Sequence, residues 1–317
     1  MTRELQNKNI LITGGAGFIG SHLADALARI PSGNLIVVDN LFVGSKENLK
    51  SLEKYKNFKF FNDDATDPNI LNHIIKEFDI EIVFNCATKP LNYSFVNPKS
   101  AFDVNTKITL NLLELQRLQK FKTLCHFSTS EVYGTSVMDE MNEDHPLNPT
   151  TPYAAGKLAA DVAVLSYHKT FDLDAFIVRP FNNFGPRQNY IPPLAGIIPL
   201  TITRILSNLP PIIHGDGLQS RDFIYVKDSI NNIINLFSII DKGDIVNISS
   251  NNEIKIRDLV DKISYKMGYN GNIKILKNRK SDVLRHKGSS KKLQSLIKQK
   301  VTNFDNALIQ TIEWYSR

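Results

Sequence analysis

Three glycines near the start of the chain constrain its fold most strongly, because they occur where a strand-like stretch changes into a helical one. Residues 9–13 are typical of a buried strand, whereas residues 18–30 carry apolar side chains at helical spacing. Gly14, Gly17 and Gly20 therefore mark a strand-to-helix turn. Glycines allow a tight turn, and the free N–H groups at a helix N-terminus attract an anion. We expect this turn to hold the pyrophosphate of a dinucleotide, a plain structural turn being the alternative.

A single acidic residue ends the next apolar stretch. Residues 35–38 are Leu-Ile-Val-Val, and Asp39 follows them directly. At the end of the second strand of a dinucleotide-binding unit, a carboxylate accepts hydrogen bonds from the adenosine ribose hydroxyls and repels a 2′-phosphate. Asp39 therefore favours NAD over NADP, and a solvated loop carboxylate is the alternative interpretation.

A tyrosine and a lysine in the middle of the chain supply the chemistry. Tyr153 and Lys157 lie one turn apart on the same face if residues 152–170 form a helix. A lysine ammonium and an oxidised nicotinamide would lower the tyrosine pKa from its ordinary value of about 10. Tyr153 could then act as a general base on a substrate hydroxyl. This spacing is common by chance, but behind a dinucleotide-binding turn it indicates a redox enzyme.

Three polar residues precede this pair. Thr129, Ser130 and Glu131 follow an apolar, strand-like stretch at residues 122–128. In open α/β sheets, ligands collect at the carboxyl ends of the strands. We therefore expect these side chains in the active-site crevice, where Glu131 either takes part in the chemistry or merely supports the wall.

The order of strand-like and helical stretches predicts an α/β fold. The strand-like stretches lie at about 9–13, 34–38, 58–61, 80–86, 122–128 and 174–179, and the helical ones at about 18–30, 68–77, 98–119 and 152–170. Their alternation is typical of a parallel sheet. We expect residues 1–180 to form a Rossmann-type doubly wound parallel sheet that binds NAD, with residues 225–249 returning to it. Residues 181–224 and 250–317 would form a smaller C-terminal α/β part that binds the substrate.

Composition and charge argue against several other classes. The 317 residues are 42% hydrophobic, yet no stretch reaches the roughly 18 apolar residues of a membrane span, and the first residues lack a signal peptide's apolar region. We therefore expect a cytoplasmic protein with no membrane partner. Cys86 and Cys125 lack the spacing of metal ligands, so we expect buried thiols and no metal. The net charge of +6 comes mostly from lysines scattered among acids, which argues against a nucleic-acid partner.

Basic residues gather in the C-terminal stretch from 274 to 300. They either form a solvated surface or include a few cations that meet a diphosphate. The cluster comprises Lys277, Arg279, Lys280, Arg285, Lys287, Lys291 and Lys292.

In their order along the chain, these motifs resemble the extended short-chain dehydrogenase/reductase family, the NAD-dependent nucleotide-sugar epimerases and dehydratases, over nearly the whole sequence. The matching positions are Gly14, Gly17, Gly20, Asp39, Asp64, Ala65, Thr129, Tyr153, Lys157, the segments 179–187, 215–217 and 221–226, Arg279, Asp282 and the segment 311–315. The resemblance implies a bound NAD, contacted by Gly14, Gly17, Phe18, Ile19, Gly20, Asp39, Asn40, Asp64, Ala65, Ala87, Tyr153 and Lys157.

The resemblance also implies a nucleotide-diphosphate sugar as the substrate. Its contacts would be Ser130, Asn182, Asn183, Arg221, Arg279 and Asp282. The two arginines and one of the two asparagines would bind the diphosphate, and the aspartate would bind the nucleotide ribose.

The resemblance further implies a homodimer. Relatives pair through a four-helix bundle, and the helices expected at 98–119 and 152–170 carry apolar residues on more than one face. Deep burial of both helices within one chain would give the same pattern.

All branches of this family share a first chemical step, which the resemblance extends to this chain. Tyr153, assisted by Thr129, would take the proton of the sugar 4-hydroxyl while C4 gives a hydride to NAD, which leaves a 4-keto sugar. A 4-epimerase then needs no further base. A 4,6-dehydratase needs a carboxylate near C5, and Glu131 would supply it.

Residues 130 and 131 order the possible reactions. Glucose-type dehydratases carry Asp-Glu where this chain has Ser130-Glu131, but mannose-type dehydratases and uronate decarboxylases resemble its Thr-Ser-Glu. We predict an NDP-sugar 4,6-dehydratase first, an NDP-sugar 4-epimerase of the UDP-glucose or UDP-N-acetylglucosamine type second, and a UDP-glucuronate decarboxylase third. A non-catalytic NAD-sensing protein is a further alternative, against which Thr129, Tyr153 and Lys157 argue.

Overall fold

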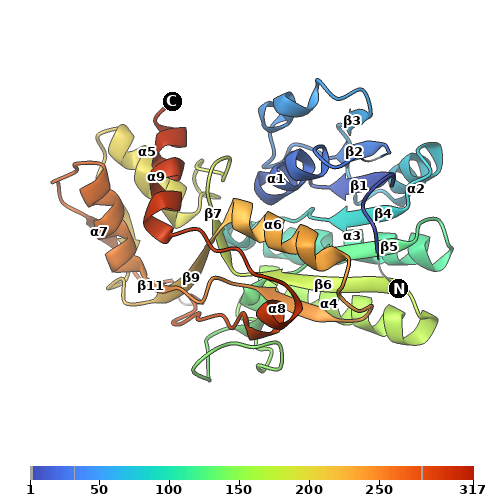
Figure 1. Ribbon diagram of the computed structural model, residues 1–317. Coiled ribbons are helices and arrows are strands. Elements are labelled where there is room, and N and C mark those ends of the chain that lie inside the picture. The colour runs from blue at the N-terminus through green and yellow to red at the C-terminus, as the bar shows by residue number, and fades with distance from the viewer. Residues whose placement is uncertain (1–2, 32, 280) are drawn as a thin grey trace.

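Short apolar stretches form the strands of one central sheet (Figure 1). A computed structural model describes residues 3–31, 33–279 and 281–317. The sheet contains β1 (Ile10–Thr13), β2 (Leu35–Val38), β3 (Phe58–Phe61), β4 (Ile82–Asn85), β5 (Thr123–Phe127), β6 (Asp174–Pro180) and β10 (Ile245–Ile248). Within the described residues these seven strands pair in parallel in the order β10-β6-β5-β4-β1-β2-β3. This order confirms the expected Rossmann-type doubly wound sheet.

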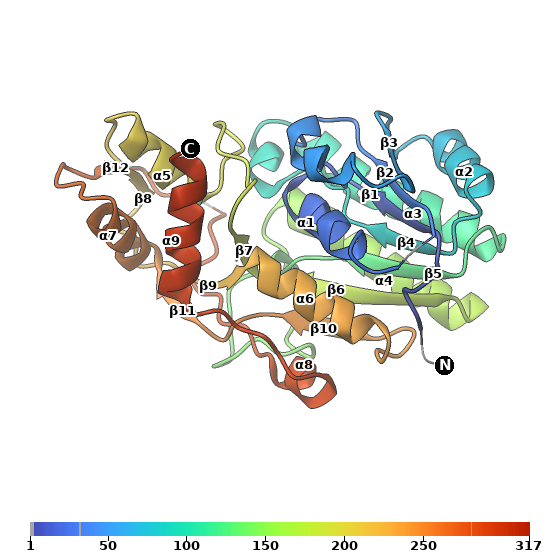
Figure 2. The ribbon, with the colours of Figure 1, turned by 45° about the horizontal axis from the view of Figure 1, so that its top comes forward.

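Helices cover both faces of the sheet (Figures 1 and 2). The first face carries α1 (Phe18–Leu27) and α6 (Val226–Phe237), and the second carries α2 (Pro68–Glu77), α3 (Pro98–Arg117) and α4 (Pro152–Phe171). Side chains of a strand alternate between the faces, so Ile10 and Ile12 enter one hydrophobic core and Leu11 enters the other. The first helix ends at Leu27 rather than at residue 30, because Pro31 disfavours a helical conformation in the residue before it.

A smaller part is built mainly from the C-terminal third of the chain. Its strands are β7 (Asn182–Phe184), β8 (Ile212–His214), β9 (Ser220–Tyr225), β11 (Glu253–Lys255) and β12 (Lys274–Leu276), and its helices are α5 (Ile197–Leu206), α7 (Ile256–Lys266) and α9 (Phe304–Tyr315). The short helix α8 (Lys291–Leu296) packs against β10 of the main sheet. Strands β11, β9 and β7 form one small sheet, and β12 pairs with β8. Helices α5, α7 and α9 lie apart from the main sheet, at the left of Figure 1. Between β9 and β11 the chain returns to the main sheet through α6 and β10.

Three short 3₁₀ helices follow strands at the carboxyl edge of the main sheet. They are η1 (Lys46–Leu52) after β2, η2 (Leu91–Phe95) after β4 and η3 (Ser130–Tyr133) after β5. In the part of the chain that the structure describes, no helix combines the length and the apolar character needed to cross a membrane.

A crevice opens where the direction of the strand order reverses. Strands β1 and β4 are neighbours, but the chain continues from β1 toward one edge of the sheet and from β4 toward the other. Such a switch point is where open α/β sheets bind their ligands. Gly14 follows β1 with a φ of +67°, and a Cβ atom there would lie 2.6 Å from the Cα atom of Ala87, which follows β4. Glycine is therefore required for the two loops to meet.

A second close approach joins α3 to α4. A Cβ atom on Gly156 would lie 2.8 Å from the carbonyl oxygen of Phe102 and 2.9 Å from its Cα atom. The Thr106 hydroxyl donates a hydrogen bond to the Gly156 carbonyl oxygen across the same contact, at 3.2 Å. Because Tyr153 and Lys157 flank this glycine on α4, the packing of the two helices also sets the position of both side chains.

We predict that Gly156→Ala lowers the free energy of unfolding by about 1–3 kcal/mol, because the methyl group would overlap backbone atoms of α3. The same substitution in an uncrowded helix would stabilise it by up to about 1 kcal/mol. Urea denaturation monitored by circular dichroism measures the change, and an unchanged or increased stability would contradict the close packing.

Candidate active site

The start of α4 places Tyr153 in the first turn of the helix. Thr151 caps this helix by accepting a hydrogen bond from the backbone N–H of Ala154 at 3.2 Å, and Pro152 is the first helical residue. Burial raises the pKa of Tyr153 to about 12, and a hydrogen bond with the Thr129 side chain opposes this rise. The protein atoms alone therefore keep the phenol protonated, and positive charge must be added for it to act as a base.

Lys157 lies one turn further along α4 and supplies such a charge. Its side chain is buried, and its ammonium donates a hydrogen bond to the carbonyl oxygen of Phe127 at the end of β5. Burial lowers the pKa of Lys157 to about 8, and the nearby Asp161 carboxylate opposes this effect. The ammonium form is thus still accessible at neutral pH, one helical turn from Tyr153.

A buried ion pair holds this part of α4 against the sheet. Asp161, one turn beyond Lys157, lies 3.0 Å from the guanidinium of Arg179 on β6 and accepts a hydrogen bond from the Ser128 hydroxyl at 2.7 Å. Both charged side chains are almost completely buried. The pair holds α4 against β6 one turn beyond Lys157.

Glu131 reaches the same region from η3. Thr129 caps this short helix, and its side-chain oxygen accepts a hydrogen bond from the backbone N–H of Glu131 at 3.2 Å. Burial raises the pKa of Glu131, while the positive charge of Arg221 opposes the rise. The charge of Glu131 in turn raises the pKa of Tyr153, so the two groups lie close enough to influence each other. Ser130, between Thr129 and Glu131 in the sequence, is buried.

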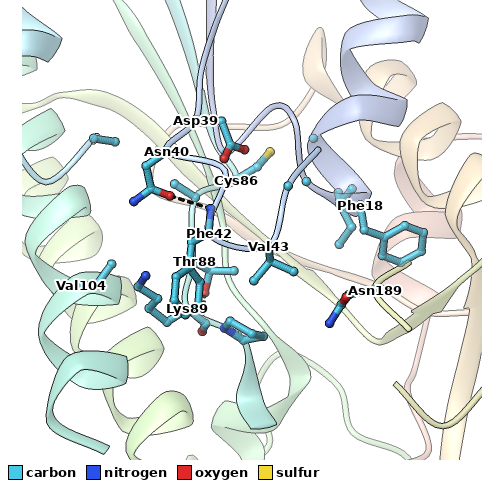
Figure 3. Close-up of a pocket in the computed structure, with 18 of the residues that line it drawn as sticks. Phe18, Asp39, Asn40, Phe42, Val43, Cys86, Thr88, Lys89, Val104 and Asn189 are labelled. Carbon is cyan, nitrogen blue, oxygen red and sulfur yellow. Dashed lines mark hydrogen bonds between the residues drawn. The ribbon is translucent and has the colours of Figure 1, made fainter. Parts of the chain in front are cut away.

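A cavity of about 370 Å³ occupies the crevice at the switch point (Figure 3). Its volume is within the usual range for a small-molecule site. Helix α1 points its N-terminus at the cavity, and Gly17 has no side chain to cap its free N–H groups. Ten residues expected to contact NAD line it: Gly14, Gly17, Phe18, Ile19, Gly20, Asp39, Asn40, Asp64, Ala65 and Ala87. These residues fit a dinucleotide, because Gly14, Gly17 and Gly20 leave the wall of the cavity without side chains at the turn, so that a pyrophosphate can approach the backbone.

Asp39 has a second role that the sequence did not reveal. Its carboxylate accepts hydrogen bonds from the backbone N–H groups of Ala16 at 3.0 Å and Leu41 at 2.8 Å, so it also holds the glycine turn in place. Asn40 donates a hydrogen bond to Asp64 at 3.0 Å on the same wall of the cavity.

Lys89 was not among the expected site residues. Figure 3 shows it beside Phe42, and its ammonium lies 3.1 Å from the centroid of that ring. It also lies within electrostatic reach of Asp39 and Asp64. Its position just after β4, at the carboxyl edge of the sheet where ligands collect, could have indicated that Lys89 belongs to the site.

Two further hollows continue from the cavity toward the smaller part. Their volumes are about 400 and 850 Å³, and Arg279 lines both. Asn92 lines the main cavity and the first of these hollows, and it accepts a hydrogen bond from Arg279 at 3.1 Å. Arg279 also lies over the Phe95 ring. The shared lining residues place the three hollows next to one another. Lys280 lies outside the described residues.

The remaining expected substrate contacts divide into two groups. Arg221 and Asp282 form an ion pair with each other at 2.6 Å, rather than standing separately. Asn182 and Asn183 lie on β7, and the amide nitrogen of Asn182 is buried without a hydrogen-bond partner among the described residues. A buried donor without a partner is costly. Asn182 does not line any of the three hollows.

Comparisons with known proteins point in one direction. Residues 10–249 match the profile of the NAD-dependent epimerase/dehydratase family. The chain is 33% identical to a putative UDP-glucose 4-epimerase of Methanocaldococcus jannaschii over 96% of this chain and 97% of that protein. It is 30% identical to the dTDP-D-glucose 4,6-dehydratase of Homo sapiens over 97% of this chain and 90% of that one. The crystal structure of a dTDP-glucose 4,6-dehydratase from Streptomyces venezuelae with NAD bound is similar, with a TM-score of 0.92 and 27% identity over 97% of both chains.

We predict that Asp39→Asn weakens NAD binding and raises the affinity for NADP relative to NAD at least tenfold, because a neutral amide no longer repels a 2′-phosphate. The amide oxygen can still accept a hydrogen bond from the glycine turn. Isothermal titration of the variant with each dinucleotide measures the ratio, and an unchanged ratio would argue against a role of Asp39 in cofactor choice.

Proposed function

The chain belongs to the NAD-dependent epimerase/dehydratase family, and on that premise we propose that it is a nucleotide-sugar 4,6-dehydratase. The observation that supports this reaction is the buried carboxyl of Glu131 close to Tyr153. A dehydratase needs such a base at C5 in addition to the group that acts on the 4-hydroxyl.

Tyr153 would open the reaction by taking the proton of the sugar 4-hydroxyl. The Lys157 ammonium and the N-terminus of α4 both favour the phenolate form that this step requires. Thr129 would orient the phenol through its hydrogen bond. NAD, held by the residues that line the cavity, would supply the hydride-transfer chemistry at C4 and C6.

Glu131 would carry out the step that removes water. Once C4 is a ketone, the proton on C5 is acidic, and the ionised carboxylate takes it. The C6–O bond then breaks, and the departing oxygen receives a proton from Glu131 and leaves as water. Because Ser130 stands where glucose-type dehydratases carry a second acid, the same carboxyl serves as base and then as acid.

The substrate would extend along the row of hollows beside the cofactor cavity. The unpartnered amide of Asn182 and the exposed guanidinium of Arg279 are suited to the diphosphate, since both offer hydrogen-bond donors. Arg221 and Asp282 lie deeper, as an ion pair that a phosphate and a ribose hydroxyl would join or separate.

A 4-epimerase is the second candidate, favoured by the 33% identity to the protein from M. jannaschii. In that reaction the ketone only turns its other face to the cofactor, so Glu131 would be part of the wall. Decarboxylation of a UDP-glucuronate is the third.

We predict that the protein, incubated with UDP-, dTDP-, GDP- and CDP-hexoses and with UDP-glucuronate, releases a product lighter than one of the hexose substrates by one water. Mass spectrometry of the products measures this. An isobaric product with an altered sugar NMR spectrum would establish 4-epimerisation instead, and loss of carbon dioxide from the uronate would establish decarboxylation.

Two variants assign the roles within that reaction. Tyr153→Phe removes the base for the first step and should lower turnover by about 10²–10⁴-fold while NAD stays bound. Glu131→Gln should still form the reduced cofactor, seen by its absorbance, but should lose no water. Unchanged turnover of either variant would refute the role given to that residue.

We further propose that two copies pair through α3 and α4. Phe102 and Leu110 on α3 and Val162 on α4 are exposed large apolar residues on this helix pair. Val162→Lys should therefore convert the dimer to a monomer, measured by light scattering after gel filtration. Ile309→Lys on α9 is a matched control, because it places the same charge on a similarly exposed apolar residue outside the pair. A wild-type monomer would contradict the proposal.

A further inference from the structure

A histidine from the far end of the chain faces the carboxyl of Glu131. His286 lies in the extended segment between β12 and α8, and its backbone N–H donates to the carbonyl oxygen of Ser220 on β9 at 3.1 Å. On the other side of this segment, the backbone N–H of Met141 donates to the carbonyl oxygen of Lys287 at 2.8 Å. Hydrogen bonds on both sides fix the segment, so His286 has a defined position.

The surroundings of His286 determine which of its ring nitrogens carries the hydrogen. The side chain is completely buried, and Nε2 lies 2.9 Å from the carbonyl oxygen of Gly134. A carbonyl oxygen can only accept, so Nε2 must carry the hydrogen. Burial lowers the pKa of His286 to about 3, so the ring is neutral and Nδ1 presents a lone pair.

That lone pair faces the carboxyl group of Glu131. Nδ1 lies 3.8 Å from Oε1 of Glu131 and has no hydrogen-bond partner among the described residues. When Glu131 is ionised, its carboxylate oxygen and Nδ1 are both hydrogen-bond acceptors, so their lone pairs repel each other. A protonated carboxyl can donate its O–H to Nδ1 after an approach of about 1 Å. The contact therefore stabilises the proton on Glu131.

The other titratable groups around Glu131 come from β9, from α4 and from the segment that also carries His286. Arg221 on β9 stabilises the ionised carboxylate, and Asp282, its partner in the ion pair, opposes it. Tyr153 on α4 faces it from the catalytic side. Together with His286, these groups have opposing effects, so neither the ionised nor the protonated form of Glu131 is stabilised by all of its neighbours.

We propose that His286 is a positioning residue that holds the proton on Glu131 between its removal from C5 and its delivery to the leaving C6 hydroxyl. The proposal rests on the 4,6-dehydratase function. The C5–H bond breaks, its proton passes to Oε1, and the O–H donates to Nδ1. The electron pair left at C5 forms the C5=C6 bond as the C6–O bond breaks, and the departing oxygen takes the proton from Oε1 as water. His286 keeps its own hydrogen on Nε2 throughout.

Two substitutions of His286 distinguish the effect of the acceptor Nδ1 from the effect of the rest of the imidazole ring. In His286→Gln, the amide nitrogen can still donate to the carbonyl oxygen of Gly134, but the acceptor beside Glu131 is lost. In His286→Asn, an amide oxygen can stand near the position of Nδ1. His22→Gln is the matched control, because His22 is another buried histidine whose Nε2 lies 3.0 Å from a backbone carbonyl oxygen, that of Pro186. His22 lies on α1, away from the segment that carries His286.

The test uses the NAD-bound enzyme and the nucleotide hexose that the wild type dehydrates. Rapid mixing follows the reduced cofactor by absorbance, and quenched samples give the rate of water loss by mass spectrometry. For His286→Gln we expect C4 oxidation within twofold of wild type, water loss slowed 10- to 100-fold, and accumulation of the 4-keto hexose. The acidic limb of the pH profile for water loss should move to lower pH, because the ionised form of Glu131 is no longer disfavoured by Nδ1.

The other variants complete the test. His286→Asn should regain at least part of the lost rate of water loss. His22→Gln should behave as wild type. In a chain that already carries Glu131→Gln, adding His286→Gln should cause no further slowing. If His286→Gln loses water at the wild-type rate, or slows both steps equally without moving the limb, the role of His286 is refuted while the dehydratase function stands. If the wild type releases only a 4-epimer, both proposals are wrong.

Discussion

The position of helix α4 against the sheet determines the geometry of the rest of the active site. Two contacts fix it: the buried Asp161–Arg179 ion pair, and the approach of Gly156 to the backbone of Phe102. Removing one partner of a buried ion pair costs about 3–5 kcal/mol, because it leaves an uncompensated charge. With the helix held in this way, its first turn brings Tyr153 to Thr129 and its second brings Lys157 to the end of β5.

Burial acts on four titratable groups of the site in the same sense, since it favours the neutral form of each. It raises the pKa of Tyr153 and Glu131 and lowers that of Lys157 and His286. Opposing charges offset part of this effect at Lys157 and Glu131. Groups whose charged and neutral forms are closely balanced are the ones that can exchange protons during a reaction. The dry pocket is therefore part of the chemistry as well as of the packing.

The fold alone does not choose among the reactions of the family. A relative named as a putative 4-epimerase and one named as a 4,6-dehydratase match 96% and 97% of this chain, at 33% and 30% identity. Both reactions need the cofactor cavity and the Tyr153–Lys157 pair, so the choice depends on what stands beside C5 of the sugar. We propose that Glu131 and the residues that surround it hold that place in this chain.

Local sequence signals determined the framework of the protein. The apolar periodicity gave the strands and helices of the main sheet, and Gly14, Gly17 and Gly20 with Asp39 gave the cofactor cavity, because strand, turn and helix are set by residues close together in the chain. Even there, Pro31 ended α1 earlier than its periodicity indicated.

Contacts between distant segments were decided by the tertiary structure alone. No spacing along the chain reveals that His286 faces Glu131, that Arg221 pairs with Asp282, or that Lys89 lies over Phe42. These pairs form because β9 and the segment after β12 pack beside η3, and because the loops after β2 and β4 meet at the crevice. The sequence therefore determined which functional side chains are present and which strands they follow. The packing of distant segments against one another decided which of these side chains are in contact.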